Sequence, residues 1–141
     1  SRDESGYFRN WIGTVENVFA IQQENPNSNQ LELAAGVVIK TPCSGVTVGS
    51  GKIVSESTSE EQYAAVAFQN DTIYTQLAQV SKGDPIIFDG SLLTYSTGIS
   101  GKTPKFLTNI DGSEPSIRSQ EGKLSENTPD YFVSVEYLSK L

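Results

Sequence analysis

The chain has 141 residues, the usual length of one domain, and 36% of them are hydrophobic, which is enough for a core without disulfide staples. Its 10 basic and 17 acidic residues give a net charge of −7, the opposite of the basic excess in most nucleic-acid-binding proteins. The chain has no histidine, only one cysteine, and no run approaching the roughly 18 apolar residues that span a bilayer, so an internal disulfide, the commonest general base and a transmembrane helix are all excluded.

Residues 1–6 are polar and predict a flexible N-terminal arm, and residues 7–141 predict a single domain, because no linker or repeat divides them. Apolar runs rich in Val, Ile, Tyr and Phe alternate with turn residues, which is typical of short strands. The expected strands cover residues 7–21, 31–39, 63–68, 85–95, 105–110 and 131–138. Gly13 lies inside the first strand and predicts a bulge or a bend there.

Two long segments are small and polar: residues 111–130 predict a loop, and residues 40–62 predict a long, partly ordered hairpin or loop, with short alternating pieces at Val46/Val48 and Ile53/Val54. In the strand 85–95, three residues are expected on one face, with a bend at Gly90 between them. These three are Ile86, Phe88 and Leu92. The last strand predicts a second alternating face, formed by Tyr131, Val133, Val135 and Tyr137.

One helix is expected, over residues 71–82, with Asn70 or Asp71 as its N-cap. Its apolar face has the spacing of a helix and consists of Ile73, Leu77 and Val80. Gly83 follows and is expected to end it. The expected order is three strands, one short helix and then two or three further strands. This order is typical of a mainly all-β fold, the five-stranded OB-type Greek-key barrel with the helix between strands 3 and 4.

The segment AVAFQNDTIYTQLAQVSKGDPIIFDGSLLTY, residues 65–95, resembles the bacterial single-stranded-DNA-binding protein family. In that family a strand ending in Phe leads into a helix, a Lys-Gly pair closes the helix, and an apolar strand ends in an acidic-Gly-x-Leu run. Phe68, Lys82-Gly83 and the run Asp89 to Leu92 match these features. The segment at 13–39 is similar in layout to the family's first hairpin, so the resemblance covers about residues 11–110.

The resemblance implies a single-stranded nucleic-acid interface on the barrel, built from aromatic platforms and basic residues. The residues we expect to form it are Arg9, Trp11, Lys40, Tyr63, Tyr95, Lys102 and Lys105. Phe106 is a further candidate platform, and Arg118 is a further candidate phosphate contact. Tyr63 and Tyr95 stand near the places where the family stacks bases on tryptophans. For the aromatic residues, a place in the barrel core is the structural alternative.

A looser similarity links the chain to OB-like domains of small bacterial envelope lipoproteins and to tRNA-anti-like OB domains. Two functions therefore stay open. The first is a non-enzymatic module that binds single-stranded nucleic acid in the bacterial cytoplasm. The alternative is an envelope module whose barrel binds a protein, a peptide or a glycan, and the charge of −7 favours it. No cofactor is expected, and no enzyme, because no nucleophile and base form a recognisable pattern.

Overall fold

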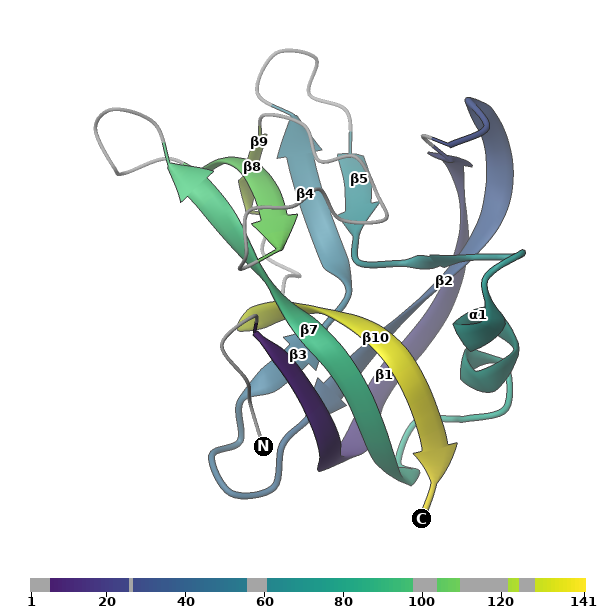
Figure 1. Cartoon of the computed structure of the whole chain (residues 1–141), viewed down its shortest axis with the longest axis vertical. Coiled ribbons are helices and arrows are strands. Elements are labelled where there is room, and N and C mark those ends of the chain that lie inside the picture. Colours follow the sequence, from purple (N-terminus) through teal and green to yellow (C-terminus); the bar gives the residue numbers. More distant parts are fainter. Residues whose placement is uncertain (1–5, 26, 56–60, 98–103, 110–121, 125–128) are drawn as a thin grey trace.

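The computed structural model describes residues 6–25, 27–55, 61–97, 104–109, 122–124 and 129–141; within these ranges, side chains are described except in 53–61 and 94–124. The fold is all-β with one short helix (Figure 1). The elements in chain order are β1 (Tyr7–Asn25), β2 (Gln30–Lys40), β3 (Thr47–Gly49), β4 (Gly51–Ser55), β5 (Glu61–Ala64), β6 (Ala67–Phe68), α1 (Thr72–Leu77), β7 (Pro85–Thr97), β8 (Pro104–Asn109), β9 (Gly122–Leu124) and β10 (Tyr131–Lys140).

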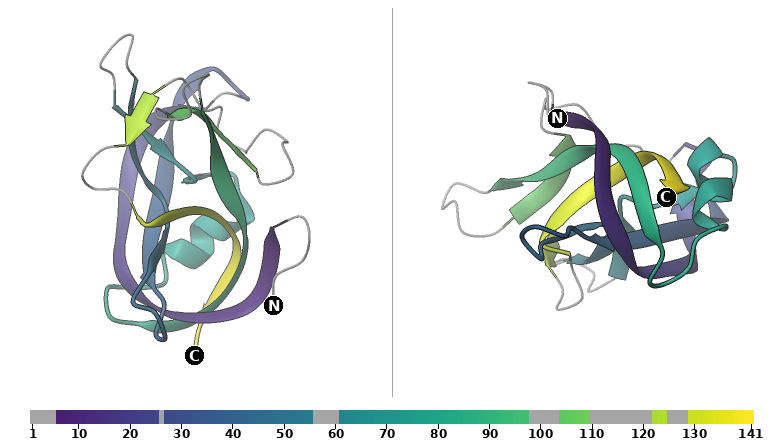
Figure 2. Two further views of the ribbon diagram at one scale, coloured as in Figure 1. Left: turned by 90° about the vertical axis from the view of Figure 1, so that its left-hand side faces the viewer. Right: turned by 90° about the horizontal axis from the view of Figure 1, so that it is seen from below.

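Five strands form a closed ring of pairings. β1 pairs with β2, β2 with β3, β3 with β10, β10 with β7, and β7 returns to β1. All of these pairs are antiparallel except β3 with β10, which is parallel. Figure 2 shows the ring from below, with β1, β7 and β10 curving around one side. The β7–β8 hairpin and the separate sheet β5–β4–β9 lie above the ring in Figure 1.

The ring closes because β1 is long enough to serve two partners. Its first half pairs with β7 and its second half with β2, and both pairings meet at Thr14. Two register shifts flank the predicted bend at Gly13, one between Phe8 and Trp11 and one between Val15 and Asn17. A Cβ at Gly13 would lie 2.4 Å from the Cγ2 of Ile39, so only glycine lets the strands approach this closely.

The main core fills the ring. Phe8, Ile39, Ile86, Phe88 and Val133 are fully buried in it. Ile86 and Phe88 confirm the predicted inner face of β7, and Leu92 is half-buried against the same core.

The helix prediction is right in position and apolar face but too long. Ile73, Leu77 and Val80 are all buried, yet α1 ends at Leu77. Beyond it the amides of Gln79 and Val80 bond to carbonyls three residues back, so the chain tightens into turns. These turns still direct Val80 inward, which explains why the helical spacing continues past the helix.

Three further expectations need correction. The predicted strand 63–68 is interrupted between β5 and β6 by Ala65, whose φ is +62°. The predicted loop 111–130 contains β9, and its residues 111–121 and 125–128 lie outside the described ones. The predicted alternation of β10 fails at both ends, because Tyr131 is 54% and Tyr137 46% exposed. A register shift between Val135 and Tyr137 turns Leu138 inward in place of Tyr137.

The predicted arm falls mostly outside the described residues, since 1–5 are not among them. Gly6, its last residue, is buried, and its carbonyl accepts a hydrogen bond from the amide of Leu92 at 3.1 Å. The two short pieces expected in residues 40–62 form strands but not a hairpin with each other: Val48 lies in β3, which pairs with β2 and β10, and Ile53 lies in β4, which pairs with β5 and β9.

Candidate functional site

Three of the seven expected nucleic-acid-binding residues cannot be located as side chains. Lys102 lies outside the described residues, and Tyr95 and Lys105 are described only by their backbone, in β7 and β8. The same holds for Phe106, which pairs with Ser96, while Arg118 is not described. The expectation for these positions therefore stays a prediction.

Trp11 and Arg9 are held near the start of β1. The Trp11 ring stacks on Phe8 with centroids 3.9 Å apart and meets Phe88 edge-on at 6.4 Å. The ring is half-buried against the main core, so its contacts favour the structural alternative. The Arg9 guanidinium lies 5.6 Å from the ring centroid of Tyr7.

Tyr63 and Lys40 lie in other parts of the fold. Tyr63 packs on Phe19 with ring centroids 5.0 Å apart, and the Lys52 ammonium lies 5.6 Å from the Tyr63 ring centroid. Both backbone polar groups of Tyr63 bond to the buried side chain of Gln23, which fixes β5 against β1. Lys40 is exposed at the end of β2. The four located residues therefore come from the start of β1, from the end of β2 and from β5.

A pocket of about 390 Å³ opens where the ring is least complete. β3 pairs with β10 at only two positions, Val48 with Tyr131 and Gly49 with Phe132, and β4 then leaves for the other sheet. α1 stands over the gap between β2 and β10, and its Gln76 Oε1 accepts a hydrogen bond from the amide of Leu138 at 2.8 Å. The pocket lining comes from β2, the β3–β4 turn, the β5–β6 turn, β6, α1 with the residue before it, β7 and β10. Its residues are Val37, Ser50, Ala65, Val66, Ala67, Asp71, Thr72, Ile73, Leu77, Ser91, Ser134, Val135 and Glu136.

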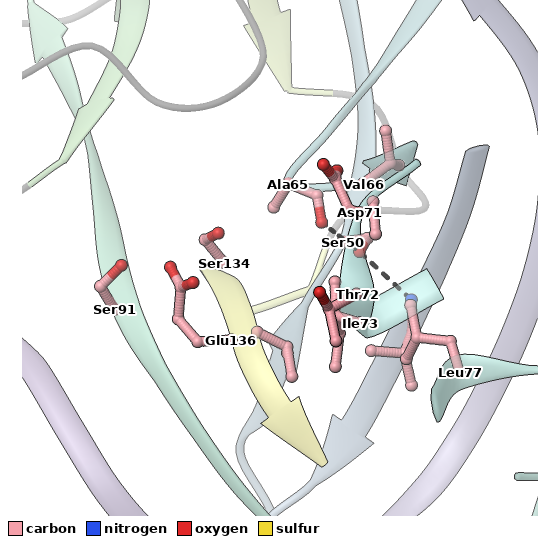
Figure 3. Close-up of a pocket in the computed structure, with 13 residues that line it drawn as sticks. Ser50, Ala65, Val66, Asp71, Thr72, Ile73, Leu77, Ser91, Ser134 and Glu136 are labelled. Carbon is pink, nitrogen blue, oxygen red and sulfur yellow. Dashed lines mark hydrogen bonds between the residues drawn. The ribbon is translucent and has the colours of Figure 1, made fainter. Parts of the chain in front are cut away.

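Ser50 ties two walls of the pocket together. It is only 1% exposed, and its Oγ donates a hydrogen bond to the carbonyl of Ala65 at 2.7 Å and accepts one from the amide of Val37 at 3.2 Å (Figure 3). The left-handed backbone at Ala65 accompanies this bond. Ser50 is therefore fully engaged and fixes the shape of the pocket rather than its binding chemistry.

Two carboxylates lie on opposite sides of the pocket, Asp71 just before α1 and Glu136 on β10 (Figure 3). The Oδ2 of Asp71 accepts a hydrogen bond from the amide of Phe68 at 2.9 Å, so Asp71 occupies the predicted N-cap position without capping a helical amide by its side chain. Burial, and then the negative charge of Asp71, raise the pKa of Glu136 above its usual value. Although much of Glu136 is exposed at the rim, its carboxylate is turned toward Ser91 and Ser134 in Figure 3.

Two serines complete the polar side of the pocket. Ser91 and Ser134 stand directly opposite each other in the pairing of β7 with β10. Cross-strand partners on one face of a sheet have Cβ atoms about 5 Å apart, so their hydroxyls form one small polar surface. Within the part of the chain that the structure describes, neither hydroxyl nor the Glu136 carboxylate has a hydrogen-bond or ion-pair partner. These groups are therefore free to meet a ligand.

Sequence reasoning missed this site. Asp71 was expected only as a helix cap, and Ser91, Ser134 and Glu136 carry no motif. Their convergence depends on the pairing of β7 with β10 and on the register shift after Val135, neither of which leaves a local signal. Among the described residues, no group of three or more His, Cys, Asp or Glu could hold a metal ion. No helix in those ranges is long and apolar enough to cross a membrane.

Comparisons of the chain with protein-family models, with curated proteins and with solved structures found no match. What the chain binds is therefore inferred from the residues of the pocket and from the charge of the molecule.

Proposed function

We propose that the chain is a non-enzymatic binding module of the OB type whose partner is a basic protein or peptide. The strand order supports the OB assignment. If β1, β2, β3, β7 and β10 are counted as strands one to five, the ring runs 1-2-3-5-4 and closes on 1, with a parallel contact between strands three and five and the helix between three and four. Barrels of this type bind oligonucleotides, oligosaccharides and proteins.

The chemistry of the pocket is the observation that supports a basic partner. Its polar side chains are carboxylates and hydroxyls, and its described lining contains no lysine or arginine. A phosphate brought to this pocket would meet Asp71 and Glu136 without a cation to neutralise it, whereas nucleic-acid affinity depends largely on such neutralisation. The net charge of −7 also repels a nucleic acid at long range.

A neutral glycan is also disfavoured. The described lining of the pocket contains no aromatic side chain, so these residues offer no flat apolar platform for a sugar ring. Aliphatic side chains and acceptor oxygens line it together, an arrangement that suits a long cationic side chain. A basic protein or peptide therefore fits the described residues best.

The test compares two labelled probes on the whole chain, a peptide of alternating glycine and arginine and a single-stranded oligothymidylate. Fluorescence anisotropy is recorded at about 50 mM and about 200 mM salt, because phosphate contacts are strongest at low salt. We expect the peptide to bind and the oligothymidylate to show no affinity even at the lower salt concentration. Binding of the oligothymidylate that weakens steeply with salt would overturn this proposal in favour of the nucleic-acid function.

A further inference from the structure

We propose that the pocket between α1 and β10 binds the cationic head of one arginine or lysine side chain, with Glu136, Asp71, Ser91 and Ser134 as its polar partners. This inference rests on the proposed function and goes beyond it, because it names the chemical group that is recognised and the residues that recognise it.

All four polar partners can accept hydrogen bonds. The two ionised carboxylates can only accept them, and the two serine hydroxyls can accept as well as donate. Asp71 uses one of its oxygens on the amide of Phe68 and keeps the other, while Glu136 has no protein partner among the described residues. A ligand that fills this site must therefore bring several N–H or O–H donors. Ammonium groups bring three and guanidinium groups bring five.

Charge selects a cation over a neutral donor. Asp71 and Glu136 face one pocket closely enough for the charge of Asp71 to raise the pKa of Glu136. A positive group placed between two carboxylates adds two attractions that offset this repulsion, whereas a neutral amide or urea adds none.

The shape of the pocket suits the rest of the side chain. Ile73 and Leu77 of α1 and Val135 of β10 form an aliphatic wall beside the polar groups. Arginine and lysine carry three or four methylene groups below their charge, and such stems pack on apolar surface while the head stays among polar atoms. A volume of about 390 Å³ lies within the usual range for small-ligand sites, with room left for water around the head.

The experiment is an NMR titration of the whole, isotope-labelled chain with N-acetyl-Gly-Arg-Gly-amide. The matched probe replaces arginine by citrulline, which keeps the length and planarity of the head but removes its charge. A lysine tripeptide and ethylguanidinium chloride form two further arms, which distinguish a peptide side chain from a free organic cation. We expect the arginine probe to shift the amides of Ser91, Ser134 and Glu136 and to bind at least about threefold more tightly than the citrulline probe.

Protein variants then test the named residues. Glu136→Gln should weaken arginine binding at least about threefold and leave citrulline binding unchanged. Asp71→Asn should also weaken arginine binding, because it removes the second negative charge. The asparagine carbonyl can still accept the hydrogen bond from the amide of Phe68, so this contact is kept. Glu24→Gln is the matched control, since it removes the same charge from an exposed residue of β1 outside the pocket lining.

The outcomes separate this inference from the proposed function. Equal binding of the arginine and citrulline probes, or equal losses in Glu136→Gln and Glu24→Gln, would overturn the assignment of the pocket. If the glycine–arginine peptide still bound in that case, the proposed function would stand and its contact would lie elsewhere. Binding of ethylguanidinium alone, with no tripeptide binding, would show that the pocket admits a free cation and not a peptide side chain, and would also overturn the inference.

Discussion

The ionised carboxylate of Glu136 lowers the stability of the folded chain. Burial and the charge of Asp71 both disfavour its ionised form, and they raise its pKa above the usual 4.5. The unfolded chain has the lower pKa, so between the two values the folded chain binds more protons. The contribution of Glu136 to stability is therefore unfavourable above the raised pKa and is relieved as the pH falls through it toward 4.5.

Replacing Glu136 by glutamine should consequently stabilise the chain at neutral pH. We expect a gain of a few tenths of a kcal/mol, because solvent at the rim screens the charge. The gain should shrink as the pH falls through the raised pKa. Urea denaturation of the wild type and of Glu136→Gln at several pH values measures this difference directly. A loss of stability at neutral pH would mean that the carboxylate has a favourable partner in the folded chain.

Ser50 predicts the opposite kind of effect. Ser50→Ala leaves the amide of Val37 and the carbonyl of Ala65 without their partner, and unpaired buried groups of this kind cost about 1–3 kcal/mol. Ser134→Ala is the matched control, because its hydroxyl has no protein partner in the described part of the chain, and should change the free energy of unfolding by less than about 0.5 kcal/mol. Similar losses in both variants would contradict the role given to Ser50.

At the scale of elements, α1 shows how far apolar spacing reaches. The pattern correctly identified the buried residues Ile73, Leu77 and Val80, but it could not distinguish a helix from a helix followed by tight turns, since both direct Val80 inward. After these turns the amide of Gly83 bonds to the carbonyl of Val15 in β1, a contact distant in sequence. The apolar spacing therefore predicted the buried residues of this segment better than it predicted where the helix ends.

Leu77 is the most deeply buried side chain of α1. It is 3% exposed, so Leu77→Ala should cost about 2–5 kcal/mol of stability through lost burial and a cavity. Leu31→Ala removes the same atoms from a side chain that is 72% exposed and should cost less than about 0.5 kcal/mol. Chemical denaturation of both variants tests this contrast. Equal costs would show that α1 does not pack as described.

The positions of the strands were likewise predicted better than their register. Their existence follows from alternating apolar residues, and most of them were predicted within a few positions. The register shifts on either side of Gly13 in β1 agree with the bulge or bend predicted there, whereas the shift after Val135 was not predicted, because β10 contains no glycine to mark it. The shift after Val135 is the important one, since it exchanges Tyr137 for Leu138 on the inner face of β10 beside Glu136. The candidate site could not be predicted from the sequence for that reason.

At the scale of the whole molecule, closure of the ring depends on pairs far apart in the chain. β1 meets β7 and β3 meets β10 across more than half of the sequence. The order of elements suggested a barrel, but only the pairings show that the ring closes and that it leaves a gap beside α1. The resemblance directed attention to aromatic and basic residues, whereas the described pocket is built from acidic and hydroxyl groups.

The most direct test of the account is a double-mutant cycle between Glu136→Gln on the chain and arginine to citrulline on the tripeptide. If the guanidinium lies against this carboxylate, each change removes the same contact, so the loss from both together should be smaller than the sum of the separate losses. We predict a coupling energy of at least about 0.5 kcal/mol, the level at which paired residues depart from additivity. Additive losses would contradict the account, because they would show that Glu136 and the cationic head act independently.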